Sequence, residues 1–429
     1  MLKRKIDNRI KELAGTGKIL ILSGARQVGK TYAALQYAND NYEHVIVVSF
    51  AEHPELIAAF ASSISGEEIL LKLSVLYGDD MIPGETIIIF DDIQECPGIL
   101  DHAAELAEDD RYVYILIGVV TDHLIREKII ASGITKLKMY PLDLEEFCLS
   151  LGVGEDDISS LRSFYESTSQ MWPKMHENFS SIYRRYLVVG GMPAAVNEYL
   201  ESRNLSRVRK VQEDIFTCYR SAVENVGDIR MTELYNGIPA ELDSTNKRFI
   251  LSDVYKYAKI DFYREGLERL CLSGTAIKVL QADEKGLSMP APRSEGLFKL
   301  YLNDTGLLTA AYGGDSQFRI LNGDTAIGHG AIVENFVAQE LTVHGVEPYY
   351  CYFRGKGEVD FLFTSGGGTV PIEVRSGKDY KRIRAVRSLV AGGVCRDGIL
   401  LHDGNIDTAG ELLCLPIYMT MFLKENDYV

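Results

Sequence analysis

The segment GARQVGKT, residues 24–31, combines residue types that together can hold a nucleotide phosphate. Its two glycines tolerate the positive φ angles that turn backbone N–H groups inward around an anion. Lys30 supplies a positive charge for the β- and γ-phosphates, and the Thr31 hydroxyl is a ligand for Mg²⁺. The pattern G-x-x-x-x-G-K-[ST] therefore predicts an ATP-binding loop formed by Gly24, Ala25, Arg26, Gln27, Val28, Gly29, Lys30 and Thr31.

An acidic pair, Asp91 and Asp92, follows the mostly apolar run TIIIF at residues 86–90. The carboxyl end of a buried strand is where ligands gather in parallel sheets. A carboxylate at Asp91 can therefore hold the Mg²⁺ of a bound nucleotide together with Thr31. The alternatives are an ordinary glycine turn at residues 24–31 and a solvated turn at the acidic pair.

The elements around these residues predict a parallel sheet. Apolar strands separated by helices are typical of a sheet that is covered on both faces. The phosphate loop then joins a strand to a helix whose positive N-terminal end points at the anion. The runs that we expect to form strands are residues 18–23, 44–50, 86–90, 112–117 and 136–140.

The whole chain is predicted to be an α/β multidomain protein, with residues 1–152 as the P-loop core. Residues 153–227 are charged and helical, which predicts a helical lid or linker. Residues 228–312 end in a helix and a hairpin-like run, which predicts a winged-helix module. Residues 313–429 predict a small α/β domain, with strands at 349–353, 359–364, 369–374 and 398–401.

Composition limits the classes of partner. Hydrophobic residues make up 46% and charged residues 25%, as in globular proteins, while a net charge of -16 repels phosphate backbones unless a local basic patch receives them. The seven cysteines form no C-x-x-C pair and the eight histidines no metal-ligand cluster, which favours a reducing compartment without zinc. No apolar run approaches the ~18 residues of a membrane span, so we expect a cytoplasmic protein without a membrane partner.

Several stretches carry a resemblance to a known family. They are ILSGARQVGKTYAALQYANDNYEHVIVVSFAEHPEL, IIIFDDIQECP, KLKMYPLDLEEF, YLVVGGMPAAV, LFKLYLNDTGLL, GAIVENFVAQEL, and EVDFLF followed by VPIEVRSG. Together they resemble the bacterial and archaeal AAA-superfamily P-loop ATPases that carry a C-terminal domain of unknown function. The resemblance covers nearly all of the chain. It implies an ATP- and Mg²⁺-binding core with Walker A and Walker B motifs, a helical lid, a winged helix and a C-terminal domain similar to PD-(D/E)xK nucleases.

Two positions depart from the pattern that this resemblance implies. Asp92 stands where AAA-type ATPases commonly carry a longer glutamate that orients the attacking water. Val119, after Gly118, stands where relatives carry a polar sensor, and Thr121 could substitute for it only if the loop shifts. Because a displacement of ~1 Å can cost ~100-fold in rate, we expect slow ATP hydrolysis, with Asp92 and Lys30 as the catalytic residues.

Three arginines are candidate phosphate or lid contacts. Arg26 lies inside the loop, and Arg184 and Arg185 precede the Gly190-Gly191 pair. The alternative is that they are surface arginines paired with acidic neighbours.

The C-terminal segment has the residue types of a second, metal-dependent site. A PD-(D/E)xK nuclease needs carboxylates that hold Mg²⁺ and a lysine that positions the attacking water. Asp360, Glu373 and the helical Glu334 match the acidic positions, whereas Arg375 replaces the lysine with a guanidinium that does not copy a compact ammonium. We therefore expect a nuclease-like fold used for binding or docking, with weak divalent-ion affinity and little or no DNA cleavage.

Three functions follow from these features. The first is an ATP-dependent switch, the second a DNA-binding protein or metal-dependent nuclease, and the third a protein-docking scaffold that keeps nucleotide as a structural ligand. The acidic helix at residues 264–268 reads the major groove poorly, which favours protein docking for the winged helix. A basic run favours DNA, unless it is a solvated helix face, and comprises Lys378, Lys381, Arg382, Arg384 and Arg387.

Overall fold

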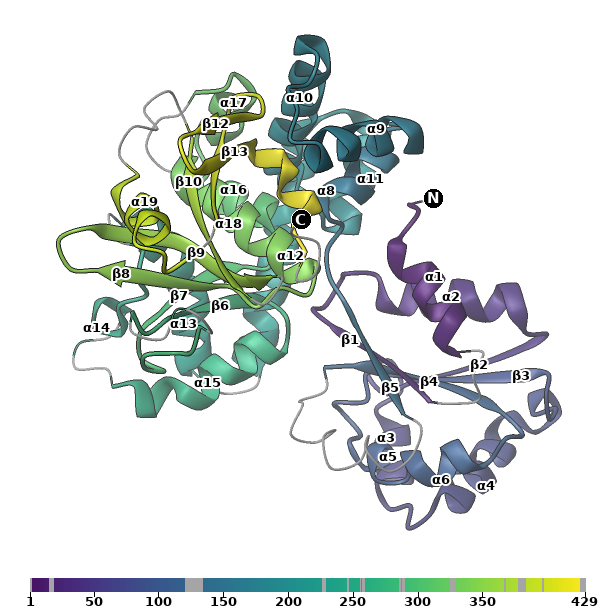
Figure 1. The fold of residues 1–429 in the computed structure, drawn as a ribbon. Coiled ribbons are helices and arrows are strands. Elements are labelled where there is room, and N and C mark those ends of the chain that lie inside the picture. Colours follow the sequence, from purple (N-terminus) through teal and green to yellow (C-terminus); the bar gives the residue numbers. More distant parts are fainter. Residues whose placement is uncertain are drawn as a thin grey trace. The chain divides into compact units, whose positions relative to one another are not determined.

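The computed structural model of the 429-residue chain divides into two compact units (Figure 1). The first unit comprises Lys3–Tyr140 with the short piece Leu272–Gly274, and the second comprises Pro141–Cys271 and Thr275–Val429. The structure describes residues 2–14, 19–119, 134–225, 229–244, 247–254, 256, 259–284, 287, 290–324, 329–365, 368–376, 383–395 and 397–424.

The first unit is built on a five-stranded sheet in the order β2-β3-β4-β1-β5, and every neighbouring pair is parallel. All five predicted strands are present, so the parallel sheet is confirmed. Their bounds are β1 Leu20–Gly24, β2 His44–Ser49, β3 Thr86–Asp91, β4 Val113–Gly118 and β5 Thr135–Met139.

Helices cover both faces of this sheet, with α1 and α2 on one side and α3 to α6 on the other (Figure 1). Because both faces are covered, β1 and β3 are buried along their whole length. On the face of α3, the rings of Phe50, Phe60 and Phe90 lie 6.0–6.3 Å apart between centroids. The bounds are α1 Lys5–Ala14, α2 Lys30–Asn41, α3 Glu55–Ala61, α4 Gly66–Tyr77, η1 Gly78–Asp80, α5 Gly98–Asp101 and α6 Ala103–Glu108.

The second unit contains an eight-stranded mixed sheet in the order β12-β13-β11-β10-β9-β8-β6-β7. The four strands predicted near its C-terminal part are present, while β12 and β13 were not predicted. The bounds are β6 Ala276–Gln281, β7 Phe298–Leu302, β8 Tyr349–Phe353, β9 Gly357–Ser365, β10 Gly368–Arg375, β11 Gly398–His402, β12 Asp407–Ala409 and β13 Leu412–Pro416.

The hairpin expected for the winged helix shares this sheet with the C-terminal strands. β6 pairs antiparallel with β7 on one side and parallel with β8 on the other. The segments predicted as a winged-helix module and as a C-terminal domain are therefore joined by main-chain hydrogen bonds. The winged helix and the division at residues 152, 227 and 312 stay predictions.

Helices make up most of the rest of the second unit. Their bounds are α8 Leu144–Ser150, α9 Glu155–Glu166, α10 Pro173–Val189, α11 Pro193–Ser202, α12 Leu205–Asn225, α13 Ile229–Asp243, α14 Leu251–Val254, α15 Ile260–Leu272, α16 Thr305–Tyr312, α17 Ser316–Leu321, α18 His329–Val343, α19 Arg384–Ala391 and η2 Ile417–Phe422. In the described part of the chain, no helix has the length and apolar character needed to cross a membrane.

Candidate nucleotide site and a second charged cluster

The phosphate loop connects β1 to α2 through a backbone that only particular residues can adopt. Gly24 has a φ of 139°, and a Cβ at this position would collide with the carbonyl oxygen of Met139 in the neighbouring strand. Gln27 and Gly29 also have positive φ angles, of 62° and 97°. Gly29 precedes α2 and has no side-chain cap, so the first N–H groups of this helix face the loop without a competing side-chain acceptor. The loop has the conformation that the motif predicts.

The Lys30 ammonium lies within this loop. Its Nζ donates hydrogen bonds to the carbonyl oxygens of Gly24, at 3.0 Å, and Ala25, at 2.7 Å. Burial lowers the pKa of Lys30 to about 8, against the opposing effect of the Asp91 and Asp92 charges. At neutral pH the side chain therefore still carries the positive charge that a phosphate requires.

Thr31 and Asp91, the two predicted metal ligands, lie in direct contact. The Thr31 Oγ1 donates a hydrogen bond of 2.6 Å to Asp91 Oδ2, which joins the start of α2 to the end of β3. Asp91 is 8% exposed, and burial raises the pKa of its carboxyl group. One hydroxyl and one carboxylate oxygen side by side are the hard oxygen donors that Mg²⁺ prefers, so this pair fits the ion.

Asp92 is held by a residue that the sequence interpretation missed. Asp92 adopts a left-handed backbone with a φ of 57°, and its Oδ1 accepts a hydrogen bond of 2.8 Å from Gln94 Nε2. The Oε1 of the same glutamine accepts a hydrogen bond of 3.1 Å from the main-chain N–H of Val119. A Cβ on Gly118 would collide with Gln94, so the glycine before Val119 makes room for this contact.

The sequence D-D-I-Q gave only a weak indication that Gln94 belongs to the site. It places the Gln94 amide two residues after Asp92, the residue predicted to orient the attacking water. The main chain at the end of β4 is therefore linked to Asp92 by the two hydrogen bonds of Gln94, and the Val119 side chain takes no part in this link. Thr121, the substitute weighed for the missing sensor, lies outside the described residues.

The candidate arginine contacts fall in different units. Arg26 is exposed in the phosphate loop of the first unit. Arg184 and Arg185 lie on α10 of the second unit, where Arg185 Nε donates to the carbonyl oxygen of Ser181 at 3.3 Å. A phosphate contact by any of the three stays a prediction.

A second cluster, in the second unit, brings together Glu334, Asp360, Glu373 and Arg375. Arg375 pairs with Glu373 and lies 3.6 Å from Asp360 Oδ2. Asp360 also accepts a hydrogen bond of 2.8 Å from the main-chain N–H of Val374. The replacement of lysine by arginine thus coincides with direct pairing of the guanidinium to two of the three predicted carboxylates.

Lysines that the sequence interpretation missed pair with the third carboxylate. Glu334 on α18 contacts Lys247 and lies 3.5 Å from the fully buried Lys299, while Tyr301 donates to it at 3.3 Å. Lys299 also pairs with Glu358 at 2.7 Å. The sequence contained one indication of this pairing: Lys299 lies within the otherwise apolar strand FKLYL, where a charged side chain needs a partner.

The acidic side chains of this cluster are paired with basic side chains of the same cluster. Although burial opposes it, the pairs with Lys247 and Lys299 lower the pKa of Glu334 to about 2. Burial and the neighbouring Asp360 charge raise the pKa of Glu373 to about 9, and its Oε2 has no hydrogen-bond partner. The raised pKa of Glu373 and its direct pairing with Arg375 both make this carboxyl group a poorer ligand for a divalent ion.

In the described residues, Glu43, His44 and Glu85 place three potential metal-ligand atoms within 4.8 Å of one another, whereas the carboxylates of the second cluster form no such group. In the basic run, Lys378, Lys381 and Arg382 lie outside the described residues. Arg384 and Arg387 lie one turn apart and exposed on α19.

Comparisons with known proteins agree with the geometry of the loop. Residues 16–148 match the model of an AAA domain family, so the first unit carries an AAA-type P-loop domain. Residues 180–317 and 329–418 match two families described only as domains of unknown function, DUF8612 and DUF4143. A search of curated proteins gives no match.

Solved structures show only distant similarity to the chain. A Walker-type ATPase of Pyrococcus abyssi has 16% identity and a TM-score of 0.45, over 73% of this chain and 96% of that one. A signal-transduction ATPase with a tetratricopeptide-repeat sensor, from Pyrococcus horikoshii, has 13% identity and a TM-score of 0.30, over 80% of this chain and 49% of that one. The replication initiator DnaA, bound to AMPPCP and single-stranded DNA, has 13% identity and a TM-score of 0.28, over 63% and 85%.

Proposed function

We propose that this chain binds Mg²⁺-ATP in its first unit, hydrolyses it slowly, and uses nucleotide binding as a switch for its other segments. The observation that carries this proposal is the 2.6 Å contact between Thr31 and Asp91 beside the Lys30 ammonium. This hydrogen bond joins Thr31 of the phosphate-binding loop to the carboxylate of Asp91 at the end of β3, 60 residues later in the sequence. That combination is the requirement for a Mg²⁺-nucleotide site.

Each residue of the site has a separate part in this function. Lys30 and the first N–H groups of α2 hold the phosphates. Thr31 and Asp91 would hold Mg²⁺, which neutralises phosphate charge when it is bound. Asp92 orients the attacking water, and Gln94 fixes the direction of the Asp92 carboxylate. Slow turnover is expected because Asp92 is shorter than glutamate and Val119 has no polar side chain, while its main-chain N–H already donates to Gln94.

Nucleotide binding is tested by thermal unfolding with and without Mg²⁺-ATP. Ligand at 100 times its Kd stabilises a protein by about 2.7 kcal/mol, so the melting temperature of the parent chain should rise measurably. Lys30→Ala should abolish the shift, and Lys11→Ala, an exposed change on α1, should preserve it. An unchanged melting temperature of the parent chain on adding Mg²⁺-ATP would overturn the proposal.

DNA binding is a second candidate function, supported by the exposed Arg384 and Arg387 on one face of α19. Titration of Mg²⁺-ATP with and without duplex DNA tests both the switch and this candidate. Any coupling must be reciprocal, so ATP should change the DNA Kd by the same factor as DNA changes the ATP Kd. Absence of DNA binding in both states would leave a protein partner or a structural nucleotide as the surviving alternatives.

For the second cluster we propose a structural ion-pair network and not a working nuclease site. The pairing of Arg375 with Glu373 and of Lys299 with Glu334 and Glu358 supports this assignment. The test is plasmid nicking with Mg²⁺ or Mn²⁺, for which we expect no activity in the parent chain. Nicking restored by Arg375→Lys would indicate a lapsed nuclease site. Nicking by the parent chain that is lost in Asp360→Ala would show that the site is active.

A further inference from the structure

Helix α4 of the first unit presents an apolar face to solvent. Its opposite face is buried through Ile69, Leu70 and Leu73, as expected for a helix that packs on a sheet. Leu71 and Val75, one turn apart, are nevertheless 64% and 80% exposed. Nearly half of the exposed large hydrophobic side chains in the described part of the chain belong to this region, the α4 face: Ile64, Leu71, Val75, Leu76 and Ile82. Such a concentration is unusual for a surface without a partner.

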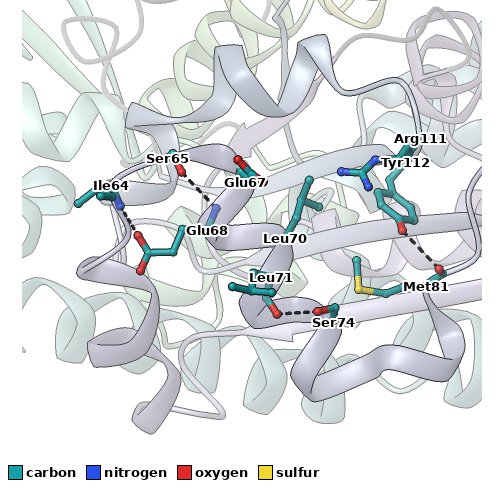
Figure 2. A pocket seen from close by; sticks show the side chains of 10 residues that line it. All are labelled: Ile64, Ser65, Glu67, Glu68, Leu70, Leu71, Ser74, Met81, Arg111 and Tyr112. Atoms are coloured by element: carbon teal, nitrogen blue, oxygen red, sulfur yellow. Dashed lines mark hydrogen bonds between the residues drawn. The ribbon is translucent and has the colours of Figure 1, made fainter.

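Two of these side chains, Ile64 and Leu71, line a pocket of about 520 Å³ (Figure 2). Ile64, Leu70, Leu71, Met81 and Tyr112 supply its apolar lining. The surrounding backbone is held in place, because Ser65 caps the first turn of α4 and the Tyr112 hydroxyl donates to the Met81 carbonyl oxygen at 3.3 Å. The α4 face therefore combines exposed apolar side chains with a preformed hollow that can receive an anchoring side chain.

The charges around the α4 face are predominantly acidic. Among the described residues, Lys72 pairs with Glu68 at 2.7 Å and the pocket-lining Arg111 pairs with Asp109 at 2.5 Å, so these two cations are already matched. Exposed acids lie at both ends of the helix: Glu67 in the first turn of α4, and Asp79 and Asp80 in η1, of which Asp80 lies 3.5 Å from the His44 ring.

This charge pattern selects among possible occupants. A second copy of this chain carries a net charge of -16 and the same acidic rim, so its approach is repelled. Two α4 helices packed side by side would bring acid against acid in either direction. A segment with apolar anchor residues flanked by Lys or Arg is not repelled, and its positive charges are attracted to the acidic side chains around the α4 face.

We propose that the α4 face is a docking site for a basic amphipathic helix of a protein partner. The partner's apolar stripe packs against Leu71 and Val75, one anchor enters the pocket beside Ile64, and its Lys or Arg residues lie opposite Glu67 and Asp79. The surface is separate from the phosphate loop residues. The proposal therefore stands whether or not the chain hydrolyses ATP.

The test uses the full chain and two fluorescein-labelled synthetic peptides, measured by fluorescence anisotropy. Both peptides carry the same leucine stripe of an amphipathic helix, one with lysines and the other with glutamates at the flanking positions. We expect the lysine peptide to bind and the glutamate peptide to bind at least about tenfold more weakly. Leu71→Ser and Val75→Ser should each weaken binding of the lysine peptide by about tenfold. The matched control is Phe318→Ser, another exposed apolar side chain, 71% exposed, on α17 of the second unit.

Other outcomes contradict the proposal. It is overturned if neither peptide binds, if both bind equally, or if Phe318→Ser weakens binding as much as Leu71→Ser does. Because Leu71 and Val75 are exposed, both variants should unfold at the parent temperature, and Val75→Ser alone suffices if Leu71→Ser fails to fold. Concentration-dependent dimerisation in sedimentation velocity that Leu71→Ser abolishes would assign the face to a second copy instead.

Discussion

Gln94 donates a hydrogen bond of 2.8 Å to the carboxylate of Asp92 while its carbonyl oxygen accepts from the N–H of Val119. One amide thus connects the residue after β3 to the residue after β4. Asp92 has a left-handed backbone, so its carboxylate direction depends on a local geometry that this amide stabilises. In the proposed ATPase, Gln94 therefore fixes the orientation of the Asp92 carboxylate without needing to contact the nucleotide itself.

Replacing Gln94 should change turnover without changing nucleotide affinity. In Gln94→Ala the Asp92 carboxylate loses its donor, and a shift of ~1 Å is expected to lower kcat about 10- to 100-fold. The Kd for Mg²⁺-ATP should stay within about twofold, because Gln94 lies outside the phosphate loop. Steady-state kinetics and calorimetric titration measure the two quantities. Glu95→Gln, a change at an exposed neighbour, is the control, and a kcat unaffected by Gln94→Ala would contradict the positioning role.

Lengthening the carboxylate and adding a polar side chain should accelerate hydrolysis. Asp92→Glu combined with Val119→Ser is expected to raise kcat with little change in Kd, because both act on the attacking water. Asp92→Glu should also lower the melting temperature slightly, since glutamate tolerates a φ of 57° less well than aspartate. A parent turnover already above about 10 per second and unchanged in the double variant would contradict this account.

Nucleotide affinity should decline at alkaline pH because burial lowers the pKa of Lys30 to about 8. Below that value the ammonium is charged and attracts the phosphates. Above it the free protein loses this charge, so binding must take up a proton, and the Kd should rise by up to about tenfold per pH unit. Titrations between pH 7 and pH 10 measure the effect. Lys30→Arg keeps its charge throughout, so any binding that it retains should show no step near pH 8.

The buried ion pairs of the second unit predict that replacing a buried lysine lowers the free energy of unfolding much more than replacing an exposed arginine. Lys299→Met removes the fully buried cation shared by Glu334 and Glu358, which then keep the partly exposed Lys247 and Arg248 as cationic partners, and we expect a loss of about 3 kcal/mol in the free energy of unfolding. Arg319→Met removes one partner of the exposed pair with Asp315 and should have a much smaller effect. Urea unfolding followed by circular dichroism compares the two. Equal, small losses would show that Lys299 is not essential to a matched cluster.

The sequence by itself determined the local parts of this protein. Apolar runs and their spacing predicted all five strands of the first sheet, and the octapeptide at residues 24–31 predicted the loop that the structure contains. The position of Asp91 after such a run predicted that it lies beside the phosphate loop, where it contacts Thr31. These predictions succeed because strand periodicity, glycine backbone freedom and the convergence of parallel strand ends act over short distances along the chain or follow from the fold class.

Only the tertiary structure decided which distant side chains meet. Lys247 and Lys299 reach Glu334 because α18 packs beside the strand that carries Lys299, and β6 joins β7 to the strands that follow. Gln94 reaches Val119 because β3 and β4 are neighbours in the sheet. Sheet order and helix packing arise from many weak contacts spread over the whole unit, so no single motif encodes them. They determine whether a predicted carboxylate is free to hold a metal or is already neutralised by a buried lysine.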